Sequence, residues 1–245
     1  NGYQALYSNT TGYQNVANGA NALLSNATGY NNVANGYGAL YNNTTGIYNV
    51  ANGYQALYSN TTGYQNVANG HQALYSNTTG YENIAIGRLA MNANIGGFRN
   101  TAVGSFAMMN NITGQDNTAY GVGAMMYSTG GQENVAIGSS LVYCNGNHNT
   151  AIGNGSLQRL NAGSKNVGVG YLAGQKYGTG VGTFLSTVDN SIYIGYDSRA
   201  KENTTTNEIV IGSGAIGNGS NTVTIGDANI TNTYLRGTTQ SPTFS

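Results

Sequence analysis

The chain has 245 residues with eight basic and eight acidic side chains, so its net charge is zero and only 7% of its residues are charged. This composition excludes the basic surface with which proteins bind nucleic acid or anionic lipid. No apolar run approaches the roughly 18 residues that cross a bilayer, so we expect no membrane insertion of this segment. The single cysteine, Cys144, rules out a disulfide framework within the chain.

The most informative feature is a repeat. Eight consecutive blocks of equal length cover residues 1–136, and the first, residues 1–17, reads NGYQALYSNTTGYQNVA. Five positions hold one residue type in every block: Gly at positions 2 and 12, Ala at 5 and 17, and Asn at 15. A fixed period without insertions indicates that each block is one unit stacked on the next. The chain starts inside a repeat, so we expect further sequence upstream of Asn1.

Each block contains two short runs that favour strands, separated by two bends. In the first block the runs are Tyr3–Tyr7 and Tyr13–Asn18, and the bends lie at Gly2 and at Asn9–Gly12. The period is too short for two-helix repeats, which need roughly 33 to 47 residues. The sequence therefore predicts an all-β fold, a parallel β-roll or β-solenoid with 17-residue turns. Stacking about 4.8 Å apart, about 14 turns would give a rod on the order of 65 Å long.

The columns formed by equivalent positions predict which side chains face inward. Position 6 is always Leu or Met and position 16 is Val, Ile or Thr, so both are expected inside. Positions 1 and 4 change from polar to apolar in the same block, which suggests a shared compartment and a one-residue phase slip at Gly2. The slip leaves two outward faces, one of Tyr3, Ala5 and Tyr7 and one of small residues at positions 15, 17 and 2.

The small-residue face predicts self-association. Small side chains repeated down one face allow another backbone to approach closely, and stacked asparagines can form amide ladders. A narrow roll also buries little surface by itself. We therefore expect a side-by-side homotrimer that packs through Ala17, Ala34, Ala51, Ala68, Ala85, Gly87, Ala102 and Gly104.

Tyrosines recur at positions 3, 7 and 13 of the early blocks, and no charged residue occurs before Glu82. Exposed aromatic columns beside amides can stack on sugar rings and bind their hydroxyls. The alternative is that stacked tyrosines only stabilise neighbouring turns. The candidate glycan-binding residues are Tyr3, Tyr7, Tyr37, Tyr41, Tyr54, Tyr58, Tyr64 and Tyr75.

The repeat also divides the chain. We expect regular β-roll repeats over residues 1–168, an irregular continuation of the roll over 169–237 and a C-terminal tail over 238–245. Within the irregular part, the glycine-rich string 178–182 is not followed by Lys and Ser or Thr. It is therefore expected to form bends rather than a phosphate-binding loop.

Residues for catalysis or metal binding are sparse. Glu82 and Arg99 lie one turn apart at position 14, so we expect a surface ion pair. His148 is close to Cys144 in sequence, but two ligands alone make a weak metal site. We therefore predict no catalytic residue, no metal and no cofactor. An enzyme, such as a tailspike glycan hydrolase, would have to use the acidic stretch from Asp189 to Glu208.

Related five-residue segments recur at the ends of the later blocks: Asn83–Gly87, Asn100–Gly104, Asn134–Gly138 and Asn149–Gly153, with looser copies at Asn166–Gly170, Ile192–Gly195 and Val223–Gly226. They resemble the N-x-V/T-A-I/V-G head repeat of trimeric autotransporter adhesins of the YadA type. The resemblance covers roughly residues 1–226 and implies a left-handed parallel β-roll with three chains packed side by side. The first five blocks depart from it, with Asn where the family has an aliphatic residue, and the repeat is longer than is usual there.

The C-terminal stretch Gly217–Gly226, followed by Asn232–Gly237, has a different resemblance. It is similar to the region that precedes the intramolecular chaperone of endosialidase-type phage tail proteins. In that family the chaperone assembles the trimer and then cuts itself off after a serine. The similarity implies that Ser245 is a processing end.

Regular repeats and near-zero charge favour a structural and adhesive shaft, either of a trimeric surface adhesin or of a phage tail-fibre protein that attaches to a host or surface. The expected partners are two further copies and a cell-surface glycan or protein receptor, with no nucleic acid. The expected location is extracellular, on a bacterial cell surface or a virion tail fibre. An ice- or surface-binding solenoid is an alternative, disfavoured because Thr10 and Thr11 are adjacent in a turn instead of alternating on a strand.

Overall fold

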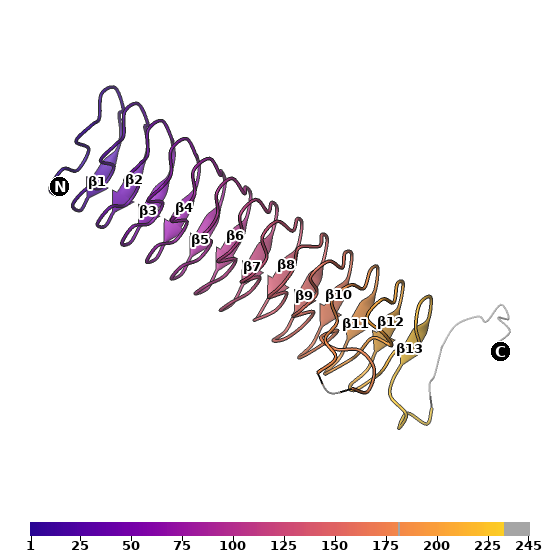
Figure 1. The fold of residues 1–245 in the computed structure, drawn as a ribbon. Coiled ribbons are helices and arrows are strands. Elements are labelled where there is room, and N and C mark those ends of the chain that lie inside the picture. Colours follow the sequence, from indigo (N-terminus) through magenta and orange to yellow (C-terminus); the bar gives the residue numbers. More distant parts are fainter. Residues whose placement is uncertain (181, 233–245) are drawn as a thin grey trace, which may run out of the picture.

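The computed structural model describes residues 1–180 and 182–232, which form one long solenoid (Figure 1). Thirteen strands of three residues lie side by side in a single parallel sheet, in the order of the sequence. Each strand pairs with the equivalent residues one turn away, so Ala51 lies between Ala34 and Ala68. The strands are β1 Val16–Asn18, β2 Val33–Asn35, β3 Val50–Asn52, β4 Val67–Asn69, β5 Ile84–Ile86, β6 Thr101–Val103, β7 Thr118–Tyr120, β8 Val135–Ile137, β9 Thr150–Ile152, β10 Val167–Val169, β11 Ile192–Ile194, β12 Ile209–Ile211 and β13 Val223–Ile225.

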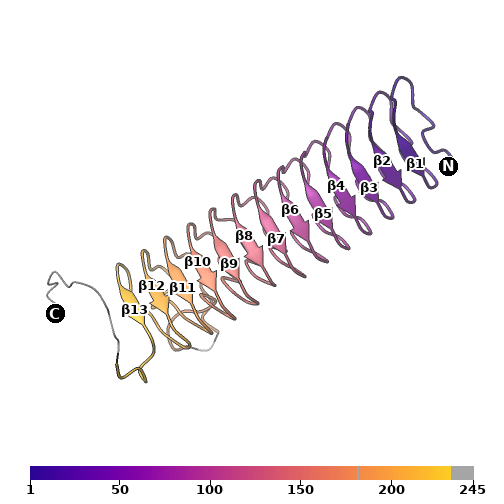
Figure 2. The same cartoon turned by 180° about the vertical axis from the view of Figure 1, so that it is seen from behind.

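The predicted all-β parallel solenoid is confirmed. From β1 to β8, each strand pairs with the equivalent strand of the next repeat block, as Val16 pairs with Val33 and Val33 with Val50, so each block forms one turn. The turns follow a common axis, and β1 and β13 lie at opposite ends of the rod (Figure 2). Among the described residues no helix is long and apolar enough to cross a membrane.

The prediction of two strands in each turn is wrong, because the run equivalent to Tyr3–Tyr7 is not extended. Within this run, positions 4 and 6 of the block have positive φ, for example 52° at Gln55 and 51° at Leu57. This left-handed conformation interrupts a strand. The backbone still bonds from turn to turn, since the amide of Leu57 donates to the carbonyl of Ala73 over 3.0 Å. The segment therefore stacks as regularly as the sheet does.

Columns of alanine, leucine and methionine fill the interior. Positions 5, 6 and 17 are buried in most turns, as Leu74 and Met91 illustrate, so the inward prediction for position 6 is confirmed. The prediction for position 16 is wrong. The alternation along each three-residue strand turns its alanine inward and its neighbours outward, as in β2, where Val33 and Asn35 flank the buried Ala34. Position 1 therefore faces outward and shares no interior compartment with position 4.

The predicted small-residue face does not lie on the surface. Gly87 and Gly104 adopt φ values of 134° and 136°, where a side chain is strained. A Cβ on either would also overlap the carbonyl of the glycine one turn further on. Packing within the chain thus accounts for these small residues, and the alanines proposed for trimer contacts are buried in their own chain: Ala17, Ala34, Ala51, Ala68, Ala85 and Ala102.

Two ladders of asparagine run through the interior. At position 15, the Nδ2 of Asn66 donates to the carbonyl of Gly80 over 2.8 Å, and its Oδ1 accepts from the amide of Asn83 over 3.1 Å. At position 9, the Nδ2 of Asn60 donates to the Oδ1 of Asn43 over 2.8 Å. The expected amide ladder is therefore present, but inside the solenoid, where these hydrogen bonds satisfy most of the buried side-chain amides.

Beyond β8 the turns vary in length while the sheet continues. The turn between β8 and β9 is shorter than a regular block, the turn between β10 and β11 is the longest, and the turn between β12 and β13 is the shortest. The longest turn forms a loop that leaves the rod between β10 and β11 (Figure 1), and in it Lys176 pairs antiparallel with Phe184. The predicted tail 238–245, the predicted processing end Ser245 and the segment from Thr233 to Gly237 lie outside the described residues.

Candidate functional site

The outward face of the sheet is apolar along most of its length. The first and third residues of each strand point away from the core, and Ile86 and Ile225 are 40% and 49% exposed. Contiguous exposed apolar surface of this kind marks an interaction site. We call the outward residues of β5–β13 the apolar stripe; they are Ile84, Ile86, Thr101, Val103, Thr118, Tyr120, Val135, Ile137, Thr150, Ile152, Val167, Val169, Ile192, Ile194, Ile209, Ile211, Val223 and Ile225.

In β1–β4 the same face is half polar. Each of these strands presents a valine and an asparagine outward. The asparagines bond to one another along the rod, since the Nδ2 of Asn18 donates to the Oδ1 of Asn35 over 2.9 Å, and that of Asn35 to Asn52 over 2.8 Å. The sheet therefore has an amide-lined N-terminal part and an aliphatic remainder.

Tyrosines form stacked columns outside the sheet. At position 3, the ring centroids of Tyr37 and Tyr54 lie 5.4 Å apart, and Tyr54 stacks on His71 at 5.3 Å. At position 7, Tyr58 lies between Tyr41 and Tyr75, at 4.8 and 5.2 Å. The interplanar angles of 7° to 17° show that the rings lie face to face. The ring faces are therefore used between turns, which leaves edges and hydroxyls for other partners.

The structure separates the candidate glycan residues into groups. Tyr37, Tyr41, Tyr54, Tyr58 and Tyr75 belong to the two columns at positions 3 and 7. Their stacking favours the alternative that the rings stabilise neighbouring turns, and excludes stacking of sugars on the inner ring faces.

The other candidates lie apart from these columns. Tyr64 belongs to a third column, at position 13, where it stacks on Tyr81 at 4.9 Å. Tyr3 and Tyr7 are exposed, and the equivalent residues in the next turn are not aromatic. His71 replaces a tyrosine at position 3 and is exposed, as its place in the repeat predicts. It stacks in the position-3 column, although the candidate glycan residues do not include it.

The columns at positions 3 and 7 lie next to each other. A Cβ placed on Gly38 would lie 3.4 Å from the Cδ2 of Tyr58, so this ring covers the backbone beside Tyr37. Burial, followed by the neighbouring phenols of Tyr41, Tyr75, Tyr37 and Tyr54, raises the pKa of Tyr58 above its ordinary value. The rings of both columns therefore lie within electrostatic range of Tyr58.

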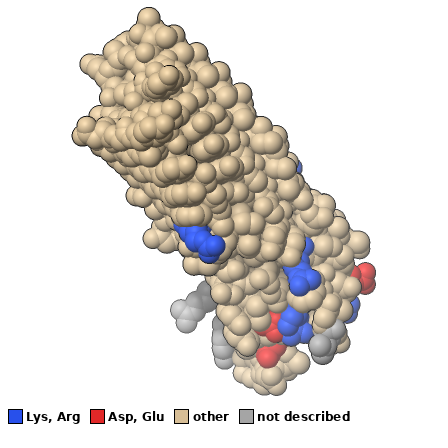
Figure 3. Space-filling model, turned by 60° about the vertical axis from the view of Figure 1, so that its left-hand side comes forward, with Lys and Arg blue, Asp and Glu red and all other residues tan. Residues whose placement is uncertain are grey.

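Charged side chains are confined to the later turns (Figure 3). The Nε and Nη2 of Arg99 donate to the two carboxylate oxygens of Asp116, each over 2.6 Å. Arg99 therefore pairs with the acid of the following turn, and the predicted Glu82–Arg99 pair is wrong: among the described residues Arg99 forms its ion pair with Asp116. These bonds hold the pKa of Asp116 below its usual value of 3.8.

The acidic stretch Asp189–Glu208 that a glycan hydrolase would need contains a buried carboxylate. Glu208 accepts hydrogen bonds from the amides of Lys201 and Gly219, over 3.2 and 2.9 Å, and from the hydroxyl of Thr205 over 3.0 Å. Glu208 directly precedes β12, which is the place of the position-15 asparagine in earlier turns. A carboxylate can accept several hydrogen bonds, so it can satisfy the backbone and hydroxyl donors that surround this place.

The two residues considered for a metal site have different surroundings. Cys144 is buried, and desolvation raises the pKa of its thiol to about 12. His148 is exposed, and its Nε2 lies 3.2 Å from the carboxylate of Glu133. Within the described part of the chain, no three His, Cys, Asp or Glu side chains come together to hold a metal ion.

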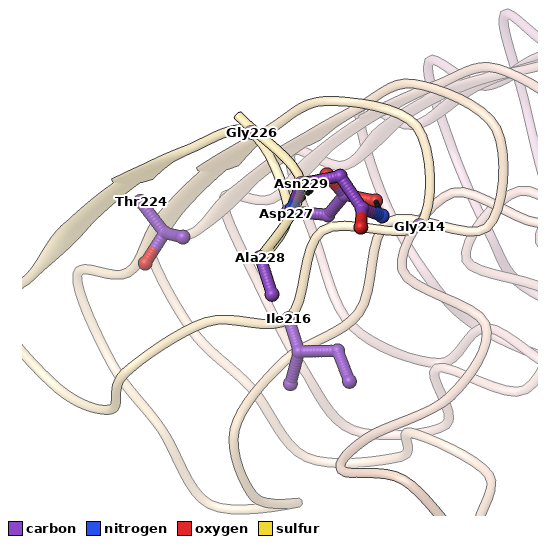
Figure 4. Close-up of a pocket in the computed structure, with 7 residues that line it drawn as sticks. All are labelled: Gly214, Ile216, Thr224, Gly226, Asp227, Ala228 and Asn229. Carbon is purple, nitrogen blue, oxygen red and sulfur yellow. Dashed lines mark hydrogen bonds between the residues drawn. The ribbon is translucent and has the colours of Figure 1, made fainter. Parts of the chain in front are cut away.

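A hollow of about 450 Å³ lies at the C-terminal end of the solenoid, beside β13 (Figure 4). The carboxylate of Asp227 accepts from the backbone amide and the Nδ2 of Asn229, over 3.0 and 2.9 Å, so it is engaged in a local turn. Among the residues that the structure describes, the lining contains no second acid or base beside Asp227. The lining residues are Gly214, Ile216, Thr224, Gly226, Asp227, Ala228 and Asn229.

Compared with known proteins, the sequence matches no family model and no curated protein. The resemblance to YadA-type head repeats therefore rests on the short segments quoted above. The two surface features that could bind a partner are the apolar stripe and the two tyrosine columns at positions 3 and 7, which lie next to each other.

Proposed function

We propose that this chain is the structural and adhesive shaft of a surface adhesin or tail-fibre protein, in which three copies pack side by side through the apolar stripe. The observation that carries the proposal is the stripe itself. It continues over nine strands, from β5 to β13, with isoleucine and valine exposed to solvent on most of them. Three parallel copies around one axis would bury all three stripes in equivalent contacts. The number three comes from the resemblance to the head repeats.

The shape supports the shaft role. A rod of stacked turns separates its two ends by a fixed distance, because the turns are bonded to one another through backbone and asparagine ladders. The early turns carry no charged side chain before Glu82, so the surface presented to a host is uncharged over the first four blocks. Such a rod holds an attachment element away from a cell or particle.

Light scattering at micromolar concentration tests the assembly. The expected mass is three times the chain mass of 25.4 kDa. Changing Ile86, Ile152 and Ile194 together to Glu places three charges per chain in the stripe and should give a monomer. A matched control changes Ile95 and Ile112 to Glu, because these exposed isoleucines lie in the turn away from the strands. A monomeric wild type, or a stripe variant that stays trimeric, contradicts the proposal.

A further inference from the structure

Two adjacent columns form one surface, which we call the tyrosine double row. It consists of the position-3 and position-7 residues of the third to fifth blocks. Along the rod, neighbouring rings in each column lie 4.8 to 5.4 Å apart. The surface therefore repeats the same groups once per turn. Its members are Tyr37, Tyr54 and His71 in one column and Tyr41, Tyr58 and Tyr75 in the other.

The double row offers hydrogen-bonding groups without charge. Tyr37 and Tyr54 are 49% and 47% exposed, so the hydroxyls at the ring tips contact water. Beside them, the Nε2 of Gln72 donates to the Oε1 of Gln55 over 2.9 Å, which adds a row of amides. The ring faces are occupied by neighbouring rings. A ligand therefore meets phenol hydroxyls, amides and ring edges, each of which can donate or accept.

This chemistry argues against a polypeptide ligand. An extended peptide binds by pairing with a free strand edge. Here the backbone is already bonded between turns, since the carbonyls of Tyr58 and Tyr75 accept from Asn42 and Ser59, each over 3.0 Å. Complementary charged groups also steer many protein partners together, and the double row has no Lys, Arg, Asp or Glu. A polyanion finds no Lys or Arg within the double row, since the first of these residues, Arg88, lies in the turn after His71.

We infer that the tyrosine double row binds a linear, uncharged polysaccharide whose chain runs along the rod axis. The rung spacing is close to the length of one sugar residue in an extended chain, so each sugar meets one pair of phenol hydroxyls. Single contacts are weak, and affinity comes from their repetition along the chain and among copies. The inference rests on the proposed adhesive function and names the ligand class of that surface.

A hydroxyl-deletion variant tests the inference. Changing Tyr37, Tyr41, Tyr54, Tyr58 and Tyr75 to Phe keeps the stacked rings and removes only the hydroxyls. The control changes Tyr13, Tyr30 and Tyr81 to Phe, which belong to the position-13 column. The probes are immobilised cellohexaose, chitohexaose and mannohexaose, with oligogalacturonate as the anionic probe. Binding is measured at low and at tenfold higher salt, and light scattering is recorded for every variant.

The expected result is that wild type binds at least one neutral oligosaccharide equally at both salt concentrations. The five-fold Phe variant should bind at least about tenfold more weakly, because several hydrogen bonds are lost, and the control should match wild type. Binding confined to oligogalacturonate, or equal binding by the five-fold variant, overturns the inference. Failure of wild type to bind any neutral probe also overturns it. In each of these cases an intact trimer would leave the shaft proposal standing, so the two failures can be told apart.

Discussion

The Nδ2 of Asn49 lies 2.8 Å from the carbonyl oxygen of Gly63, which belongs to the next turn of the solenoid. The Oδ1 of the same side chain accepts from the amide of Asn66 over 3.1 Å. The side-chain amide of Asn49 thus links its own turn to two points of the next turn, the bend at Gly63 and Asn66 just before β4. The same bonds recur at position 15 along the rod, so the ladder fixes both the spacing and the register of the turns.

Changing Asn49 to Ala should lower the free energy of unfolding by about 2–4 kcal/mol, because the buried carbonyl of Gly63 and the amide of Asn66 lose their partners. The measurement is the midpoint of thermal and urea unfolding followed by circular dichroism. The control is Asn52→Ala, in the outward ladder, where water replaces the lost hydrogen bond and the effect should stay below about 1 kcal/mol. Equal losses in the two variants would show that the buried ladder has no special role.

Gly70→Ala should destabilise the rod by about 2–5 kcal/mol, from the left-handed strain and the overlap with a packed neighbour. Gly70 has a φ of 145°, and a Cβ there would overlap the carbonyl of Gly87. Gly96→Ala is the control, because Gly96 is not in the left-handed region and its Cβ would meet only the Oγ1 of Thr79, at 3.3 Å. Unfolding midpoints should fall for the first variant and stay unchanged for the second. A tolerated Gly70→Ala would contradict the close stacking at this position.

Removing the guanidinium in Arg99→Gln should raise the pKa of Asp116 toward its usual value of 3.8, because the hydrogen bonds and charge that lower it are lost. A carboxyl with a lowered folded-state pKa contributes stability above its unfolded pKa and loses it as the pH falls through the folded value. The wild type should therefore melt higher than the variant at neutral pH, and the difference should vanish in acid. NMR titration of Asp116 measures the pKa directly. A difference that persists below the folded pKa would assign the effect to packing instead of the ion pair.

Changing Asn52 and Asn69 together to Ile should extend the apolar stripe into the N-terminal turns, because Asn69 lies directly beside Ile86. If copies associate through this face, the variant trimer should dissociate at lower total concentration and melt at a higher temperature than the wild type, because more apolar surface leaves water. Sedimentation across a dilution series provides the measurement. The same pair of changes at position 4, in Gln55 and Gln72, serves as the control and should leave the assembly unchanged. No difference from wild type would limit the contact to β5–β13.

The repeat is sufficient to predict the fold class, because equivalent residues one period apart must lie beside each other in any stacked solenoid. Which side chains point into the solenoid and which point outward cannot be predicted in the same way. The sequence favours an outward Asn15 because amides are mostly exposed, yet its partners Gly29 and Asn32 come from the following turn and satisfy it inside. A small residue such as Ala17 suits a close contact between chains and a narrow interior equally well. Its side chain is placed inside by the packing of the residues in the neighbouring columns.

The tyrosine columns can be located from the sequence, but the orientation of their rings cannot. Position 3 predicts that Tyr54 follows Tyr37, whereas the face-to-face geometry depends on how far the turns lie apart. The pairing of Arg99 is likewise undecided in the sequence, since acids flank it one turn away on both sides, Glu82 and Asp116. Sequence spacing gives the neighbours of a side chain in a solenoid, and rotamers select among them.

Because the cross-section stays constant, the number of blocks is a ruler. Residues 52–68 repeat residues 1–17 without a change. Loss or gain of one such block would shorten or lengthen the rod by about 4.8 Å, the strand spacing, and would leave the neighbours of the remaining residues nearly the same. Reach can therefore change in small fixed steps during evolution while the interior, the outward face and the ends keep their chemistry.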